Sequence, residues 1–212
     1  MSQHDWSFWG IYTSVEFLLG FEFMEQLDNK DKLILLRSFC VKASLFAGAM
    51  RAKREGRDRL MTVDGRDVYP DNLKRLEVLK IDIKSFSLTR LEKFPEGLLH
   101  RIRSLLVCRL IELKVTSEEF ALVNVILCCN PAVTGLSESA QSILAIWQKK
   151  CSSYLFQYCQ YYYQHTAPTR FTDLLSLCHV VNRNFEDVQY MTMLFKIYIQ
   201  GVKYRRIVNE VV

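Results

Sequence analysis

Arg51 is the residue of this sequence with the most specific candidate role in binding. It closes a long apolar stretch that begins at Leu33. A guanidinium in that place offers a planar pair of donors that suits a carboxylate. The alternative is that Arg51 shares a solvated helix end with Lys53 and Arg54, because charged side chains are mostly exposed unless they are paired. Both interpretations remain open from the sequence.

The seven cysteines are odd in number and contain no CxxC pair. Most of them have apolar neighbours, as buried thiols do. This usage argues against a disulfide framework and against a zinc site, and it favours a reducing compartment. The cysteines are Cys40, Cys108, Cys128, Cys129, Cys151, Cys159 and Cys178.

Catalytic chemistry finds no support in the sequence. The four histidines are far apart in the chain, and neither a Gly-rich phosphate loop nor a nucleophile elbow occurs. Cys178 and His179 are adjacent, so on a helix their side chains point to different sides. We therefore expect no enzyme activity, no catalytic residue, no metal and no cofactor.

Composition favours one globular domain. The chain has 212 residues, of which 50% are apolar, and a formal net charge of +5. The basic clusters at 51–59 and 203–206 fit solvated helix ends better than phosphate contacts. The N-terminus shows no secretory signal, and no uninterrupted apolar run approaches the roughly 18 residues of a membrane span. We expect a soluble intracellular protein without a membrane partner.

Helical periodicity dominates the elements that would position these residues. Apolar side chains recur at three- and four-residue spacing from Leu33 to Met50 and occupy nearly all sides, which predicts a buried central helix. Its small residues, such as Ser44 and Gly48, either let neighbouring helices approach or leave room for a ligand. The Asp-Gly turn within 60–69 predicts a single β-hairpin. A helix from about Asp71 should follow it.

Several helix ends are marked by capping residues. Asp28 can cap the central helix, and Thr116 with Glu119 forms a capping box for a helix that should end before Pro131. Ser137 should cap a long helix that reaches about residue 163. The break at 167–169 predicts a last long helix from about Arg170. The sequence thus predicts an all-α domain with one small β-hairpin.

Four landmarks in order resemble the nuclear hormone receptor ligand-binding domain. The first is the segment 17–37, which matches at Phe17, Leu27, Asp31, Lys32, Leu35, Leu36 and Arg37. The hairpin, the 119–137 segment and the 170–175 segment follow in the family's order. The resemblance implies a three-layer α-helical sandwich over residues 1–212, of the divergent nematode type. The zinc-finger, DNA-binding half of such receptors has no counterpart in these 212 residues, so we expect no direct DNA contact from this chain.

The family places its ligand pocket beneath the central helix. The matching positions imply that a small lipophilic ligand, fatty-acid-like in its acidic group, contacts Trp6, Gly10, Cys40, Ser44, Gly48 and Arg51. Arg51 matches the arginine that pairs with a carboxylate in acid-binding receptors. Trp9, Tyr12 and Phe46 are expected in the core rather than in the pocket.

The resemblance also implies a coregulator groove for an amphipathic partner helix. The family brackets that helix with a lysine and a glutamate. Residues 207–212 fit the activation-helix pattern and supply Glu210, although a frayed terminus explains them as well. Leu19 occupies the lysine position, and Arg37 matches the next basic position. We expect weaker or altered coactivator binding.

The implied function is ligand-responsive transcription regulation in the nucleus, or shared between nucleus and cytoplasm. The family forms homodimers or heterodimers through its tenth helix, where this chain has Leu174, Leu175 and Leu177, although burial within the domain explains these leucines equally well. The alternative functions are an orphan dimerisation or sequestration module and a lipid-binding helical protein that recruits no coactivator.

Overall fold

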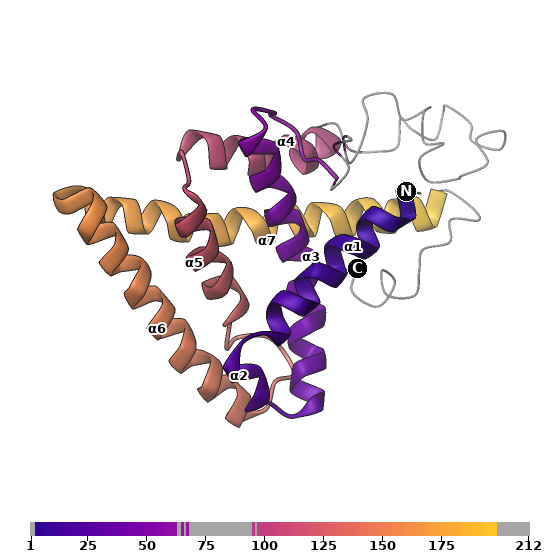
Figure 1. Cartoon of the computed structure of the whole chain (residues 1–212). Helices are drawn as coiled ribbons and strands as arrows, with labels where there is room; N and C mark the ends of the chain where they lie inside the picture. Colours follow the sequence, from indigo (N-terminus) through magenta and orange to yellow (C-terminus); the bar gives the residue numbers. More distant parts are fainter. Residues whose placement is uncertain (1–2, 63–64, 66, 68–94, 96, 199–212) are drawn as a thin grey trace.

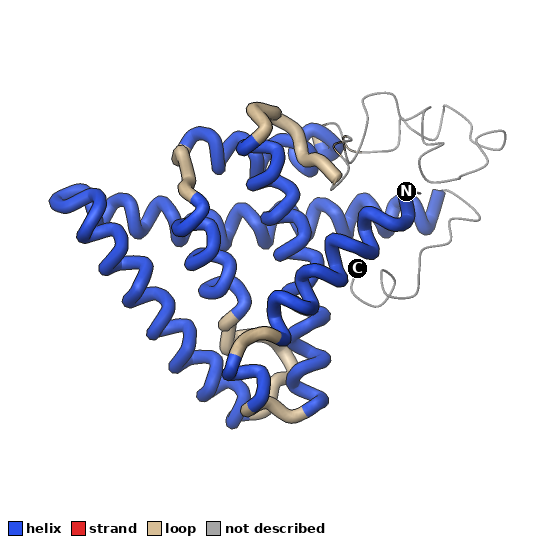
Figure 2. Tube along the Cα trace, viewed as in Figure 1, coloured by secondary structure: helices blue, strands red, loops and turns tan. Residues whose placement is uncertain are grey.

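Helices account for nearly all of the part of the chain that the structure describes (Figures 1 and 2). The computed structural model describes residues 3–62, 65, 67, 95 and 97–198. This agrees with the predicted all-α class, and the division into three layers stays a prediction. The elements are α1 (Gln3–Leu19), α2 (Glu22–Glu25), α3 (Asn29–Arg54), α4 (Leu98–Glu112), α5 (Ser117–Cys128), α6 (Glu138–Tyr163), the 3-10 helix η4 (Gln164–Thr166) and α7 (Ala167–Tyr198).

The predicted central helix is α3. It packs against α1, α4, α5 and α7, which explains why apolar residues occur on nearly all of its sides. Phe46 and Ala49 are fully buried in the larger core cluster, and Leu35 is buried in a second one. By length and composition, α3 could also cross a membrane, contrary to the expectation from uninterrupted apolar runs. More than half of its most apolar window is buried inside the fold, as in the core helix of a globular domain.

The predicted N-terminal caps are confirmed. The Asp28 carboxylate accepts from the Asp31 backbone N–H at 2.7 Å, and Thr116 and Glu119 form both hydrogen bonds of the capping box. Ser137 caps α6 and also donates its hydroxyl to buried Asp31 at 2.6 Å. Hydrogen bonds from Ser137 are the main cause of the lowered pKa of Asp31. The start of α3 is thereby tied to the start of α6.

Two boundaries differ from the sequence prediction. The last helix begins at Ala167 rather than near Arg170, so Pro168 lies in its first turn, where a missing backbone N–H costs little. The break falls instead at Gln164, whose φ of 48° is in the left-handed region.

Of the predicted hairpin, the described residues show an isolated antiparallel bridge between Met61 and Asp67. The rest of the hairpin, the helix from Asp71 and the activation-helix candidate 207–212 lie outside the described residues.

The longest helices give the molecule a wedge-like outline (Figure 1). Helices α6 and α7 meet at one corner through η4 and diverge from there, and α5 packs against both. On the other side, α1 packs against α3, and α4 packs against α3 and α7. The sites described next lie at these helix contacts.

Candidate ligand and coregulator sites

Arg51 lies in the last turn of α3 with its side chain half-buried. Its Nε atom is buried and has no hydrogen-bond partner within the described part of the chain. Burial lowers the pKa of the guanidinium, Arg54 adds to that effect and Glu55 opposes it. A buried donor without an acceptor costs free energy, so this arginine can gain from an added anionic or polar group.

The main chain at Leu60 and Met61 covers α3 beside Arg51. A Cβ atom on Gly48 would lie 3.2 Å from the Met61 carbonyl oxygen and 3.8 Å from Arg51 Nη2. The Leu60 N–H donates to the Arg103 carbonyl of α4 at 2.7 Å. The absence of a side chain at Gly48 therefore allows this segment to sit between α3 and α4. Gly48 serves this close approach in the structure.

Arg57 holds the turn that follows. Its Nη1 donates to the Gly65 carbonyl at 2.7 Å and lies 3.9 Å from Met61 Sδ. Its Nη2 pairs with Asp67 at 3.6 Å. These contacts fix the described ends of the predicted hairpin next to Arg51, although both charged partners are partly exposed.

The other small residues of the predicted pocket meet one another. A Cβ on Gly10 would lie 2.2 Å from Ser44 Oγ, so these two positions provide the close contact between α1 and α3. Cys40 is 1% exposed and packs with Ile11 and Val41, and burial raises the pKa of its thiol to about 12. Trp6 belongs to α1, but its side chain lies outside the described residues.

The aromatic residues that the sequence assigned to the core divide into two groups. Phe46 is fully buried, as predicted. Trp9 and Tyr12 are 43% and 42% exposed, so that prediction was wrong for them. They contact each other and Phe8 on the outer side of α1, because the inner side is taken by Ile11 and Ser14.

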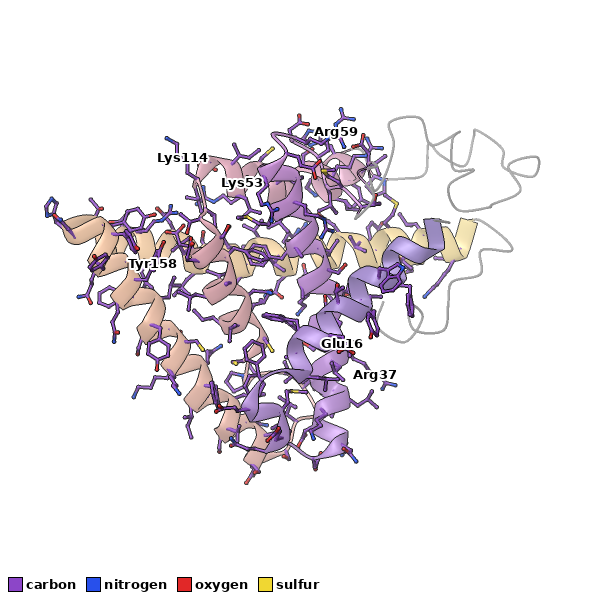
Figure 3. All side chains as sticks on the ribbon, in the orientation of Figure 1. Glu16, Arg37, Lys53, Arg59, Lys114 and Tyr158 are labelled. Atoms are coloured by element: carbon purple, nitrogen blue, oxygen red, sulfur yellow. The ribbon has the colours of Figure 1, made fainter. Side chains whose placement is uncertain are left out.

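Two of the three residues proposed for the coregulator groove, Leu19 and Arg37, are exposed on α1 and α3. Leu19 is 47% exposed at the end of α1, and Leu33 is 46% exposed on α3. Arg37 is also exposed on α3, and Figure 3 shows it with Glu16 of α1. Glu210, the third predicted groove residue, lies outside the described residues. The structure therefore places two of the three on helices that pack together.

The leucines of the possible dimer surface are largely internal. Leu174 and Leu177 are fully buried, and Leu175 is partly buried against the same core. Burial within the domain, the alternative left open by the sequence, accounts for Leu174 and Leu177.

A buried ionic network ties α5, α6 and α7 together, and sequence reasoning found only its capping-box part. Glu119 is completely buried and accepts hydrogen bonds from Arg170, Tyr163 and the Thr116 backbone. Burial alone would raise the pKa of Glu119, but these donors, Arg170 first, hold it below its usual range. Arg170 also donates to the Leu113 carbonyl at 2.6 Å and lies over the Tyr163 ring. All these groups are engaged with one another, so the network is structural.

A second polar link, also missed from the sequence, joins α4 to α7. Arg101 donates two hydrogen bonds, of 3.0 and 2.9 Å, to the buried carboxylate of Asp187. One turn earlier, Asn184 donates to the Ile102 carbonyl at 3.1 Å. The two residues of each pair are more than 80 positions apart in the chain, which leaves no local signal to read.

Among the described residues, no group of three His, Cys, Asp or Glu side chains could hold a metal ion. All seven cysteines are free thiols, five of them buried. Burial raises the pKa of Cys151, Cys159 and Cys178, the last to about 11. A raised pKa favours the protonated form of these three thiols, which is not the nucleophilic form.

Comparison with known proteins agrees with the landmarks in the sequence. The model of the ligand-binding domain of nuclear hormone receptor matches residues 2–198. Similar proteins from Caenorhabditis elegans include nuclear hormone receptor family member nhr-51, 38% identical over 99% of this chain and 53% of its own length. Family members nhr-52 and nhr-9 are 34% and 32% identical, each over 99% of this chain and 58% of its own length. The chain thus spans about half the length of the curated relatives it matches.

Proposed function

We propose that this chain, which belongs to the nuclear hormone receptor ligand-binding domain family, is the ligand-sensing part of a transcription regulator. Members of that family are in general non-enzymatic, ligand-regulated transcription factors of the nucleus. It would bind a small lipophilic molecule and recruit coregulators, by a population shift in which ligand favours one arrangement of residues 207–212. The proposed place of action is the nucleus, or nucleus and cytoplasm.

The observation that carries this proposal is the buried, unpartnered Nε of Arg51 among the described residues. The guanidinium sits at the end of an apolar helix, so a ligand with an apolar body and one acidic group would satisfy it. Gly48 and the Leu60–Met61 segment are the nearby groups of the proposed site. Cys40, about three turns earlier on α3, is proposed on the family resemblance. Trp6, Gly10 and Ser44 are proposed on the family resemblance.

Oleic acid and oleyl alcohol form a matched pair of probes, because they share a chain and differ in the acidic group. The wild-type chain is expected to prefer the acid by about tenfold, the value of a charge-assisted hydrogen bond. The Arg51→Ala variant should lose this preference while keeping affinity for the alcohol. An Arg54→Ala control, which changes an exposed neighbour, should retain it. Equal binding of the acid by wild type and Arg51→Ala would refute the anchor.

Coregulator binding is proposed over α1 and α3, with Arg37 and Glu210 at the ends of the groove. Leu19 replaces the lysine that would bind the partner's terminal carbonyls, so affinity for a leucine-rich amphipathic peptide should be low. A peptide pull-down should show stronger binding for Leu19→Lys and weaker binding for Glu210→Ala. Ile146→Lys, on the exposed side of α6, is the control for added charge. No change in either groove variant would reject the groove.

A second candidate function is an orphan module that works by dimerisation or sequestration with a filled interior. It is favoured by the close contacts of Gly10 with Ser44 and of Gly48 with Met61, which use the small residues for packing. Native mass spectrometry of the purified chain separates the two candidates. A bound lipid mass supports the ligand sensor, whereas an empty dimer that binds neither oleyl compound supports the orphan module.

A further inference from the structure

The exposed surface of α6 is poor in acidic residues. No Asp or Glu occurs between Glu138 and Asp173, whereas Lys149 and Lys150 lie within this stretch. Three tyrosines of the helix, Tyr154, Tyr161 and Tyr162, are 50%, 78% and 62% exposed. Exposed tyrosine is typical of protein interfaces, because the ring contributes apolar area and the hydroxyl a hydrogen bond.

Helices α6 and α7 converge at the corner that holds η4 (Figure 1). Where they pack together, α6 also borders an open depression of about 380 Å³, which none of these three tyrosines lines. Phe156 of α6 and Phe171 of α7 supply its apolar part, with their rings edge to face and centroids 5.3 Å apart. The remaining lining side chains, all from one face of α6, are serines, glutamines and one lysine, Lys149. The depression therefore combines an aromatic surface, neutral hydrogen-bonding groups and a single positive charge.

We propose that this depression is a docking surface for an acidic segment of a partner protein. An apolar side chain of that segment would rest against Phe156 and Phe171, and an adjacent carboxylate would pair with Lys149. Ser152 and Gln157 would form hydrogen bonds with the backbone of the partner segment. Charge complementarity carries the choice of partner, since no carboxylate of this chain lines the depression. Its open shape suits weak and reversible binding. The surface lies on other helices than Arg51 and the α1–α3 groove.

Fluorescence anisotropy with a short labelled peptide of Glu, Phe and Ser residues tests this proposal on the full chain. Lys149→Glu and Ser153→Glu each place an acid in the lining and should weaken binding by about three- to tenfold at low salt. Lys150→Glu is the matched control: it makes the same charge change one residue away, where the side chain contacts Trp147 instead of the depression. It should change affinity by less than about twofold. Circular dichroism would verify that all variants fold.

Any one of the following results would overturn the proposal. The first is that a peptide with Lys in place of Glu binds as well as the acidic peptide. The second is that Lys150→Glu weakens binding as much as Lys149→Glu, or that the wild type does not bind the acidic peptide. The third is that sedimentation shows a dimer of this chain that Lys149→Glu disrupts and the peptide does not, which would assign the face to a second copy.

Discussion

Arg170 and Arg51 each lie close to one end of a long helix, but their environments are opposite. Arg170, near the start of α7, is 12% exposed and donates to Glu119 and to the Leu113 carbonyl. Arg51, near the end of α3, is half-buried, and its Nε lacks a hydrogen-bond partner among the described residues. Burial opposes the charge of both, yet Glu119 raises the pKa of Arg170, whereas the pKa of Arg51 is lowered.

This difference separates a structural charge from one that is available to a ligand. A buried ion pair with all its hydrogen bonds made leaves nothing for another molecule to satisfy. A partly buried donor without an acceptor carries an energetic cost that a ligand can remove. The end of the molecule where α5, α6 and α7 meet is therefore expected to be rigid. The end at Arg51 is where ligand chemistry should be sought.

The largest effect should come from removing the partner of Arg170. Glu119→Ala would leave a buried guanidinium without its carboxylate, which typically costs about 3–5 kcal/mol. Urea unfolding followed by circular dichroism measures this loss. Glu112→Ala removes the exposed carboxylate of the Arg109–Glu112 pair and is the control, with an expected change within about 0.5 kcal/mol. Similar losses in the two variants would show that burial does not distinguish these pairs.

The pH dependence of the same pair sharpens the comparison. The folded-state pKa of Glu119 is below the ordinary value of 4.5, so its stabilisation is fully present above that pH and is lost as the pH falls further. The difference in unfolding free energy between wild type and Glu119→Gln should therefore narrow below about pH 4.5. A difference that stays constant from pH 7 to pH 3 would mean that the carboxylate is not stabilised in the folded state.

The next effect concerns the packing beside Arg51. Gly48→Ala places a methyl group 3.2 Å from the Met61 carbonyl oxygen and 3.3 Å from Leu60 Cδ1. The backbone cannot yield easily, so overpacking of about 1–3 kcal/mol should exceed the gain of about 1 kcal/mol in helix propensity. Thermal unfolding should show a lower Tm. If Gly48→Ala raises the Tm, the Leu60–Met61 segment is not held against α3.

Gly10→Ala in a Ser44→Ala background provides the contrast. There the group at 2.2 Å is a hydroxyl, which the second substitution removes, and the remaining Ser44 Cβ contact of 3.4 Å is ordinary. Relative to Ser44→Ala alone, the added Ala should stabilise the chain by up to about 1 kcal/mol through helix propensity. A loss instead would show that α1 and α3 approach more closely than a methyl group permits.

A smaller effect is expected within the Arg170 network. Tyr163→Phe removes one donor to Glu119, at 2.8 Å, and leaves the bonds from Arg170 and Thr116 in place. The expected loss is about 1 kcal/mol, the net value of one hydrogen bond. Tyr162→Phe, at an exposed neighbouring position, should be nearly neutral. Burial and the bond to Glu119 also raise the pKa of Tyr163 to about 12, so the Tyr163→Phe variant should lose a late-titrating component from the absorbance titration of the wild type.

Local signals explain which parts of this structure the sequence could predict. Asp28, Ser137 and the pair of Thr116 and Glu119 cap helices through residues three positions away, so their patterns are visible in a short window. The break before α7 was misplaced because Pro168 is compatible with a first helical turn. The all-α class followed from the three- and four-residue spacing of apolar side chains, a signal that recurs along most of the chain.

Contacts between distant residues were not predictable in the same way. Arg170 is 51 residues from Glu119, and Arg101 is 86 residues from Asp187. Small residues were recognised on α3, but the sequence could not tell that Ser44 meets Gly10 or that Gly48 meets Met61. Arg51 illustrates the same limit, because its two interpretations differ only in what surrounds the guanidinium.

The smallest stability effect is expected for Arg51→Met. Removing an unsatisfied, half-buried guanidinium while keeping its apolar length should leave the free energy of unfolding unchanged or raise it by up to about 1 kcal/mol. Urea unfolding without added ligand measures this, with Arg54→Met as the exposed control. A loss of several kcal/mol would make Arg51 a structural residue like Arg170. Unchanged stability would instead mean that the fold does not need this arginine, which would support the proposed role in binding.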